Sequence, residues 1–259
     1  MSRRHFLAGV GAGAAVFCIL AARPARAQVR HDAWTALLET YVVESPDGIN
    51  RVRYARFKEE AGAVLDDYLA SLQASRVSAL GRAEQFAFWA NLYNALTVRV
   101  ILDHYPVASI RDINLGGGFF ARGPWKKELV NVEGRSLSLD DIEHGILRRD
   151  FGDPRVHYAL NCASIGCPNL QRQAFSGDRL EAMLDEGARA YVNHPRGLTV
   201  DGGRITASRI YDWFAEDFGD GTAIRRHWLA YAESGLASQL READGVAGYA
   251  YDWGLNDAG

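Results

Sequence analysis

FAFWANLYNAL, residues 86–96, is the stretch that decides the fold, because it is the most apolar part of the chain after the first 27 residues. It lies within a segment from Ala83 to Tyr105 that contains no helix breaker, and Pro106 ends that segment. Apolar side chains point to nearly every side of a helix built from these residues, which is typical of a buried helix. We therefore expect a central core helix over residues 83–105.

Asn91 and Asn94 are the polar exceptions in this helix, and a spacing of three places them on one face. A buried amide without partners costs about 1–3 kcal/mol, so both must find hydrogen bonds. Either they hold a neighbouring loop in place or they line a binding site.

The other hydrophobic patterns predict a mostly helical α+β domain with a small antiparallel sheet. Helices are expected over His31–Val43, Tyr54–Ser75, Leu139–Arg149, Asp178–Val192 and Ala223–Leu240, with a short helix through Ile210 and Phe214. Hairpins are expected over 128–137 and 197–206, and strands over Val156–Leu160 and Gly248–Trp253. No repeat, linker or composition shift divides residues 28–259, which indicates a single domain.

The first 27 residues have the pattern of an export signal: a charged start, an apolar run and an Ala-x-Ala end. The pair Arg3-Arg4 resembles a twin-arginine signal, which exports folded proteins. The apolar run from Phe6 to Ala22 is shorter than the roughly 20 residues of a membrane span. We expect cleavage after Ala27, a periplasmic or secreted protein, and no membrane span afterwards.

The charge balance argues against nucleic acid as a partner. The chain has 29 basic and 32 acidic residues, a net charge of −3. The expected signal carries four arginines and no acid, so its loss would bring the net charge to −7. Nothing concentrates the positive charge that a phosphate backbone requires.

Chemically reactive side chains gather in RVHYALNCASIGCP, residues 155–168. Cys162 and Cys167 are the two cysteines outside the signal, and an oxidising compartment favours a disulfide between them. A redox pair is a further alternative, although thiol exchange favours the shorter C-x-x-C spacing. His157-x4-Cys162-x4-Cys167 contains zinc-type ligands without the short spacing of a zinc knuckle, so no metal and no other cofactor is expected.

Alternatively, Cys162 is a nucleophile. A cysteine nucleophile needs a base that forms the thiolate, usually with a third group that orients the base. His157 and His144 are the candidate bases, and Glu143 could orient one of them. In an extended chain His157 would lie about 16 Å from Cys162, so direct pairing requires a sharp turn near Asn161.

The candidate binding residues are Asn91, Asn94, Asn161 and Arg155. We expect the partner to be a small-molecule or peptide ligand.

Four separated motifs, in order, resemble the family called domain of unknown function 547 (DUF547). They are Phe88–Leu96, Leu139–Arg148, Asp153–Cys162 continuing through Cys167–Leu170, and Tyr251–Asn256. The resemblance covers roughly residues 80–256 and implies a fold similar to papain- and transglutaminase-like cysteine enzymes. In transglutaminases, however, the cysteine comes first and starts a core helix, whereas here His157 precedes Cys162 and the core helix has no cysteine. Either the arrangement is permuted or the chemistry has been lost.

Two functions follow as expectations. One is an exported cysteine-dependent hydrolase or acyl transferase acting on amide or thioester bonds. The other is a non-catalytic periplasmic binding or structural module with a Cys162–Cys167 disulfide.

Overall fold

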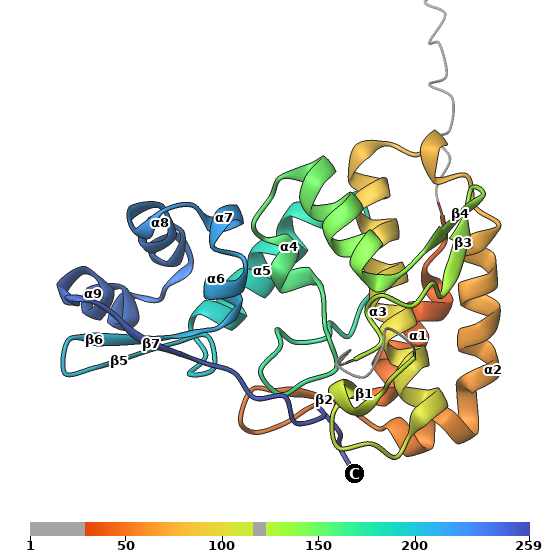
Figure 1. Cartoon of the computed structure of the whole chain (residues 1–259), viewed down its shortest axis with the longest axis horizontal. Coiled ribbons are helices and arrows are strands. Elements are labelled where there is room, and N and C mark those ends of the chain that lie inside the picture. The colour runs from red at the N-terminus through yellow and green to blue at the C-terminus, as the bar shows by residue number, and fades with distance from the viewer. Residues whose placement is uncertain (1–28, 116–122) are drawn as a thin grey trace, which may run out of the picture.

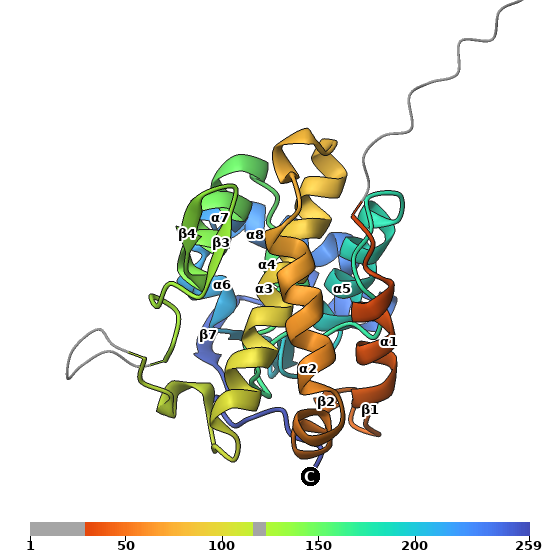
Figure 2. The same ribbon diagram turned by 90° about the vertical axis from the view of Figure 1, so that its right-hand side faces the viewer.

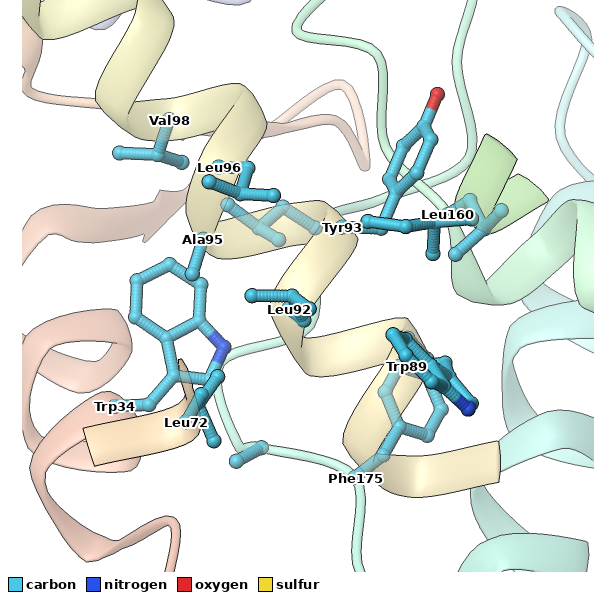
Figure 3. Close-up of a cluster of buried hydrophobic side chains, with 14 of the residues drawn as sticks. Trp34, Leu72, Trp89, Leu92, Tyr93, Ala95, Leu96, Val98, Leu160 and Phe175 are labelled. Atoms are coloured by element: carbon cyan, nitrogen blue, oxygen red, sulfur yellow. The ribbon is translucent and has the colours of Figure 1, made fainter. Parts of the chain in front are cut away.

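The computed structural model describes residues 29–115 and 123–259, and helix α3 (Arg82–His104) lies at the centre of its larger hydrophobic core. Nearly every residue from Phe86 to Leu102 is buried, which confirms the predicted core helix. Figure 3 shows its side chains between Trp34 of α1 (Asp32–Tyr41), Leu72 of α2 (Tyr54–Gln73) and Phe175. In Figure 2, α2 and α3 run side by side.

Short elements connect and cover these helices. They are the hairpin of β1 (Val42–Glu44) and β2 (Asn50–Val52), the 3-10 helices η1 (Val77–Ala79) and η2 (Ile110–Asp112), and the hairpin of β3 (Val130–Val132) and β4 (Arg135–Leu137). Helix η3 (Asp141–Phe151) follows with π-helical hydrogen bonding. Before it, Ser138 and Asp141 exchange hydrogen bonds as a capping box, with Ser138 N–H donating to Asp141 Oδ2 at 2.9 Å and Asp141 N–H to Ser138 Oγ at 3.1 Å.

A second, smaller core packs around α5 (Leu180–Val192) and a three-stranded sheet. Strands β5 (Leu198–Asp201) and β6 (Arg204–Ser208) form the predicted antiparallel hairpin, whereas β7 (Gly245–Ala250) pairs with β6 in parallel. The remaining helices are α6 (Ile210–Trp213), α7 (Ala215–Phe218), α8 (Gly221–Tyr231) and α9 (Ser234–Glu242). Figure 1 shows this part beside the α1–α3 part, with α4 and α5 between. The predicted mostly helical α+β class is confirmed.

The strand predicted over Val156–Leu160 is wrong, because these residues begin a short helix, α4 (Val156–Ala159). Asp153 starts it: its backbone carbonyl accepts from Val156 N–H and its side chain from Arg155 N–H. Pro154 suits the first turn of a helix, since its missing N–H would have no partner there. All five residues of the predicted strand are buried, so the alternation of side chains in the sequence did not reflect one buried and one exposed face.

The segment after β7 returns to the larger core. Leu255 pairs with Ser164, Asp257 pairs with Val52, and the buried Tyr54 hydroxyl donates to Asn256 Oδ1 at 2.7 Å. Residues 251–257 therefore join the two cores. The last strand lies earlier than predicted, at 245–250 instead of 248–253.

None of the helices in residues 29–115 and 123–259 is both long and apolar enough to cross a bilayer. The predicted export signal lies outside the described residues.

Candidate functional site

A cavity of about 240 Å³ lies between the two cores. It is lined by Tyr93, Trp125, Asp140, Glu143, His144, His157, Leu160, Cys162, Cys167, Ile210, Trp213, Phe214, Tyr251 and Trp253. All four predicted catalytic residues are in this set, although they come from η3, α4 and the loop after α4. The turn at the end of α4 therefore brings His157 and Cys162 to one cavity, which an extended strand would have prevented.

The two cysteines form a close pair. Their sulfur atoms are 2.7 Å apart without a bond, and Cys167 Sγ accepts from the Cys162 backbone N–H at 2.9 Å. Cys162 Sγ is also 3.0 Å from the Tyr251 hydroxyl and 3.3 Å from Ser164 Oγ. Cys162 is partly exposed and Cys167 is buried. The Cys162–Cys167 disulfide stays a prediction.

The pair shares its protons unequally. The contact with Cys167, together with burial, raises the pKa of the Cys162 thiol well above its usual value. Burial acts to raise the pKa of Cys167 as well, but hydrogen bonds from Cys162 and Tyr251 outweigh burial and lower it. The two thiols therefore titrate as a pair, and a thiolate on either sulfur is stabilised by the other thiol across the 2.7 Å contact.

His157 is held by a carboxylate that no sequence pattern indicated, that of Asp217. Its Nε2 lies 2.6 Å from Asp217 Oδ2, and its ring stacks on Phe214 with centroids 4.0 Å apart. Arg148 Nε donates to the same Asp217 oxygen at 2.5 Å. Burial acts to raise the pKa of Asp217, but the bonds from His157 and Arg148 keep it at about 2.

This geometry fixes the tautomer of His157. An ionised carboxylate only accepts, so Nε2 carries the proton and Nδ1 keeps a lone pair. No hydrogen bond reaches Nδ1 from the described part of the chain. Burial lowers the pKa of His157 against the opposing effect of Asp217, which keeps the imidazole neutral near pH 7 and able to act as a base.

The two other predicted residues occupy different environments. Glu143 is buried, and burial raises its pKa. His144 is exposed; its Nδ1 is 3.0 Å from Arg148 Nη1. Glu143 makes no hydrogen bond to His157 or His144, whereas Asp217 binds His157. No hydrogen bond joins a cysteine to an imidazole within residues 29–115 and 123–259.

Asn91 and Asn94 bind the backbone of neighbouring segments, and neither of them lines the cavity. Asn94 Nδ2 donates to Ala159 O at 2.9 Å, and Asn94 Oδ1 accepts from Asn161 N–H at 2.9 Å. Asn91 makes the same two-sided contact with the backbone of Phe175. Of the two alternatives for Asn91 and Asn94, the structural one agrees with these contacts.

Asn161 and Arg155 also have structural partners. The Asn161 side chain donates to Pro168 O at 2.7 Å and accepts from Ala163 N–H at 2.9 Å, which closes the loop between the cysteines. Arg155 binds three carboxylates, those of Asp153, Glu181 and Asp185, away from the cavity. Its guanidinium is therefore held by carboxylates outside the cavity.

Six of the fourteen lining residues are Trp, Tyr or Phe, and none of them was among the predicted site residues. Trp213 packs on Tyr251 and Trp253, with ring centroids 4.9 and 5.5 Å away, and Trp253 packs on Trp125 at 5.8 Å. Trp213 is 42% exposed, which is high for a tryptophan and places it at the rim. The Tyr251–Asn256 motif was the sequence signal that could have indicated Tyr251 and Trp253 as site residues. Trp125 and Trp213 lie far from this motif in the chain.

In the part of the chain that the structure describes, no three His, Cys, Asp or Glu side chains converge as a metal site.

Residues 77–192 match the model of the family described as "Protein of unknown function, DUF547", which supports the resemblance of this region to that family. The matched range contains α3, η3, α4 and both cysteines. No curated protein and no solved structure matches the chain. The likeness to papain- and transglutaminase-like folds therefore remains a prediction.

Proposed function

We propose that the protein is a cysteine-dependent hydrolase or acyl transferase acting on amide or thioester bonds. The observation that supports this most directly is the cavity between the two cores, where a thiol pair and a carboxylate-held neutral imidazole line the same walls. These are the nucleophile, base and orienting group that thiol-based acyl transfer requires.

Cys162 is the nucleophile in this proposal, because it is the partly exposed member of the pair. His157 Nδ1 takes the Cys162 proton through one water or a substrate atom, since the two side chains are not hydrogen-bonded directly. The sulfur then forms a bond to the carbonyl carbon, and the carbonyl oxygen takes the negative charge. The Tyr251 hydroxyl, 3.0 Å from the sulfur, is the nearest hydroxyl donor for that oxygen.

The leaving amine or thiol departs with the proton held by His157, and a thioester to Cys162 remains. Water, or an acceptor amine in a transferase, attacks this thioester, gives its proton to His157 and releases the acyl group. The Cys162 thiolate then takes that proton back. The aromatic walls would hold an apolar part of the acyl donor.

Turnover of a generic acyl donor tests the proposal. We expect reduced protein to hydrolyse 4-nitrophenyl acetate or a short thioester, and Cys162→Ala to abolish this. His157→Ala should lower the rate about 100-fold or more, the usual contribution of a general base. His104→Ala, at the exposed end of α3, is the control and should retain the rate. Full activity in Cys162→Ala would rule the proposal out.

A binding or structural module with a Cys162–Cys167 disulfide is the second candidate, favoured by the contact between the two sulfurs. If this candidate is right, protein purified without reductant should have an intact mass lower by two hydrogen atoms and should not be labelled by iodoacetamide. Two free thiols in that protein would exclude it. Localisation in the periplasm, expected from the first 27 residues, belongs to both candidates.

A further inference from the structure

Arg196 binds the chain both before and after Cys167, and it does not line the cavity. It lies between α5 and β5; its Nη1 donates to Ile165 O at 3.0 Å and its Nη2 to Asn169 Oδ1 at 2.6 Å. Its guanidinium lies 5.5 Å from the centre of the Tyr191 ring, and the Tyr191 hydroxyl donates to Gly166 O at 2.7 Å. Three bonds thus hold the segment 165–169 with Cys167 at its middle.

This arginine lacks the partner that the other enclosed arginines have. Arg148 and Arg155 each bind at least two carboxylates. Among the described residues no carboxylate oxygen lies within 4.0 Å of Arg196, and its Nε is buried without a hydrogen-bond partner. Arg196 is partly buried, and a cation that is partly removed from water is normally paired with an anion because its lost hydration is costly.

We propose that the thiolate of the Cys162–Cys167 pair is the missing anion, and that Arg196 sets the pH at which this pair becomes nucleophilic. Arg196 is then a positioning residue, since it acts on the sulfur through space and meets no substrate. The inference rests on the proposed function only in treating the pair as the reactive group.

The other ionisable groups around the pair do not supply a cation. Tyr54, Tyr93, Tyr191 and Tyr251 face it from α2, α3, α5 and the segment after β7, and burial raises the pKa of each well above its usual value, so they are neutral. Asp47, which faces Arg196, is bound to Arg51 at 2.6 Å. Across the cavity, His157 is neutral, and the carboxyl group of Glu143 can be neutral or negative but never positive. The positive charge acting on Cys167 therefore comes from Arg196, whose effect lowers the pKa of that thiol.

The test is the pH profile of iodoacetamide alkylation in reduced protein, read by mass spectrometry on the peptide that contains Cys162 and Cys167. We expect Arg196→Gln to raise the apparent pKa of the pair by about one unit, since an adjacent opposite charge shifts a pKa by about 1–3 units. Arg196→Lys should restore most of the wild-type profile. Arg189→Gln removes the same charge from the exposed side of α5 and should leave the profile unchanged.

Two results would overturn the inference: a wild-type profile in Arg196→Gln, or an equal shift in Arg196→Lys and Arg196→Gln. Asn169→Ala separates the effect of the Arg196 charge from the effect of its hydrogen bond to the loop. It replaces Arg196→Gln as the test if that variant does not fold. It removes the Nη2 bond and keeps the cation, so a wild-type profile supports the inference and a one-unit shift contradicts it. Alkylation needs no turnover, so an inactive protein with the expected shifts would refute the acyl transferase and retain the role of Arg196.

Discussion

Asp217 determines what His157 can do, because it accepts from Nε2 and leaves Nδ1 as the basic nitrogen. Asp217→Asn should lower turnover about 100-fold or more while the thiols still react with iodoacetamide. An amide can donate as well as accept, so it no longer selects the tautomer. Comparing the rate of ester hydrolysis with the rate of alkylation separates loss of the base from loss of the nucleophile.

The lowered pKa of Asp217 also predicts how the stability of the protein changes in acid. Its pKa is about 2 in the folded protein against 3.8 when free, so its contribution is complete above about pH 4 and is lost as the pH falls through 2. Wild type should therefore be more stable than Asp217→Asn at pH 7, and the difference should shrink between pH 4 and pH 2. Urea unfolding of both proteins across this range measures it. A difference that does not change with pH would contradict the assignment.

The pKa of Glu143 is shifted in the opposite direction to that of Asp217, so its effect on stability has the opposite dependence on pH. Burial raises its folded pKa above 4.5, so the contribution of Glu143 to stability is most favourable below pH 4.5 and is lost as the pH rises through the folded pKa. Glu143→Gln keeps the shape without the charge, and should be at least as stable as wild type at pH 8 and lose its relative advantage at pH 4. Thermal melts at the two pH values give the comparison. A large loss of stability at pH 8 would show that the carboxylate is a required ion partner.

Residue types alone pointed to Cys162, His157, His144 and Glu143 as site residues, and the structure places all four at one cavity. Asp217 could not be selected in this way. It is 60 residues from His157 in the chain, in a short helix that contains two acids, and nothing local distinguishes it from Glu216. Long-range pairing of this kind depends on how the second core packs against the first.

At the scale of elements, the cysteine loop and the segment after β7 approach each other at Gly166. Its N–H donates to Asp252 O at 2.8 Å, and a Cβ there would lie 2.8 Å from Asp252 N and 2.9 Å from Asp252 O. Gly166→Ala should therefore destabilise the protein by about 1–3 kcal/mol, as overpacking does. It should also expose Cys162 to faster alkylation. Urea unfolding and alkylation rates are the measurements.

Gly145→Ala is the matched control, because a Cβ on Gly145 of η3 would meet nothing within 4 Å. It should be neutral or stabilising by about 0.5–1 kcal/mol, since alanine in a helix costs less entropy than glycine. Equal destabilisation by both substitutions would contradict the close approach at Gly166.

Long, strongly patterned elements were predictable from sequence: α2, α3, α5 and both hairpins lie within a few residues of the expected positions. The error at α4 came from four short-range hydrogen bonds that outweigh an alternating pattern. The parallel pairing of β7 with β6 was not predictable, because the two strands are separated by four helices and only the packed second core brings them together.

At the scale of the whole molecule, each core contains a histidine whose burial lowers its pKa to about 4: His31 beside Tyr68, and His227 beside Tyr158. The unfolded chain binds more protons than the folded one between pH 6.5 and 4, so stability should decrease as the pH falls through this window. His31→Gln and His227→Gln should each flatten that decrease, and the double variant should flatten it further. Unfolding midpoints at half-unit pH steps check this, and slopes identical to wild type would refute it.

Residues 251–257 have a consequence for biosynthesis. They provide Tyr251 and Trp253 to the cavity, and they are translated after every other residue that lines it. A nascent chain that ends before Tyr251 can fold its α1–α3 core while its two sulfurs still lack that cover. The cavity is thus completed only after Tyr251 and Trp253 have been added, and a ribosome-stalled fragment that ends before them would present both thiols without that cover to whatever oxidant surrounds it.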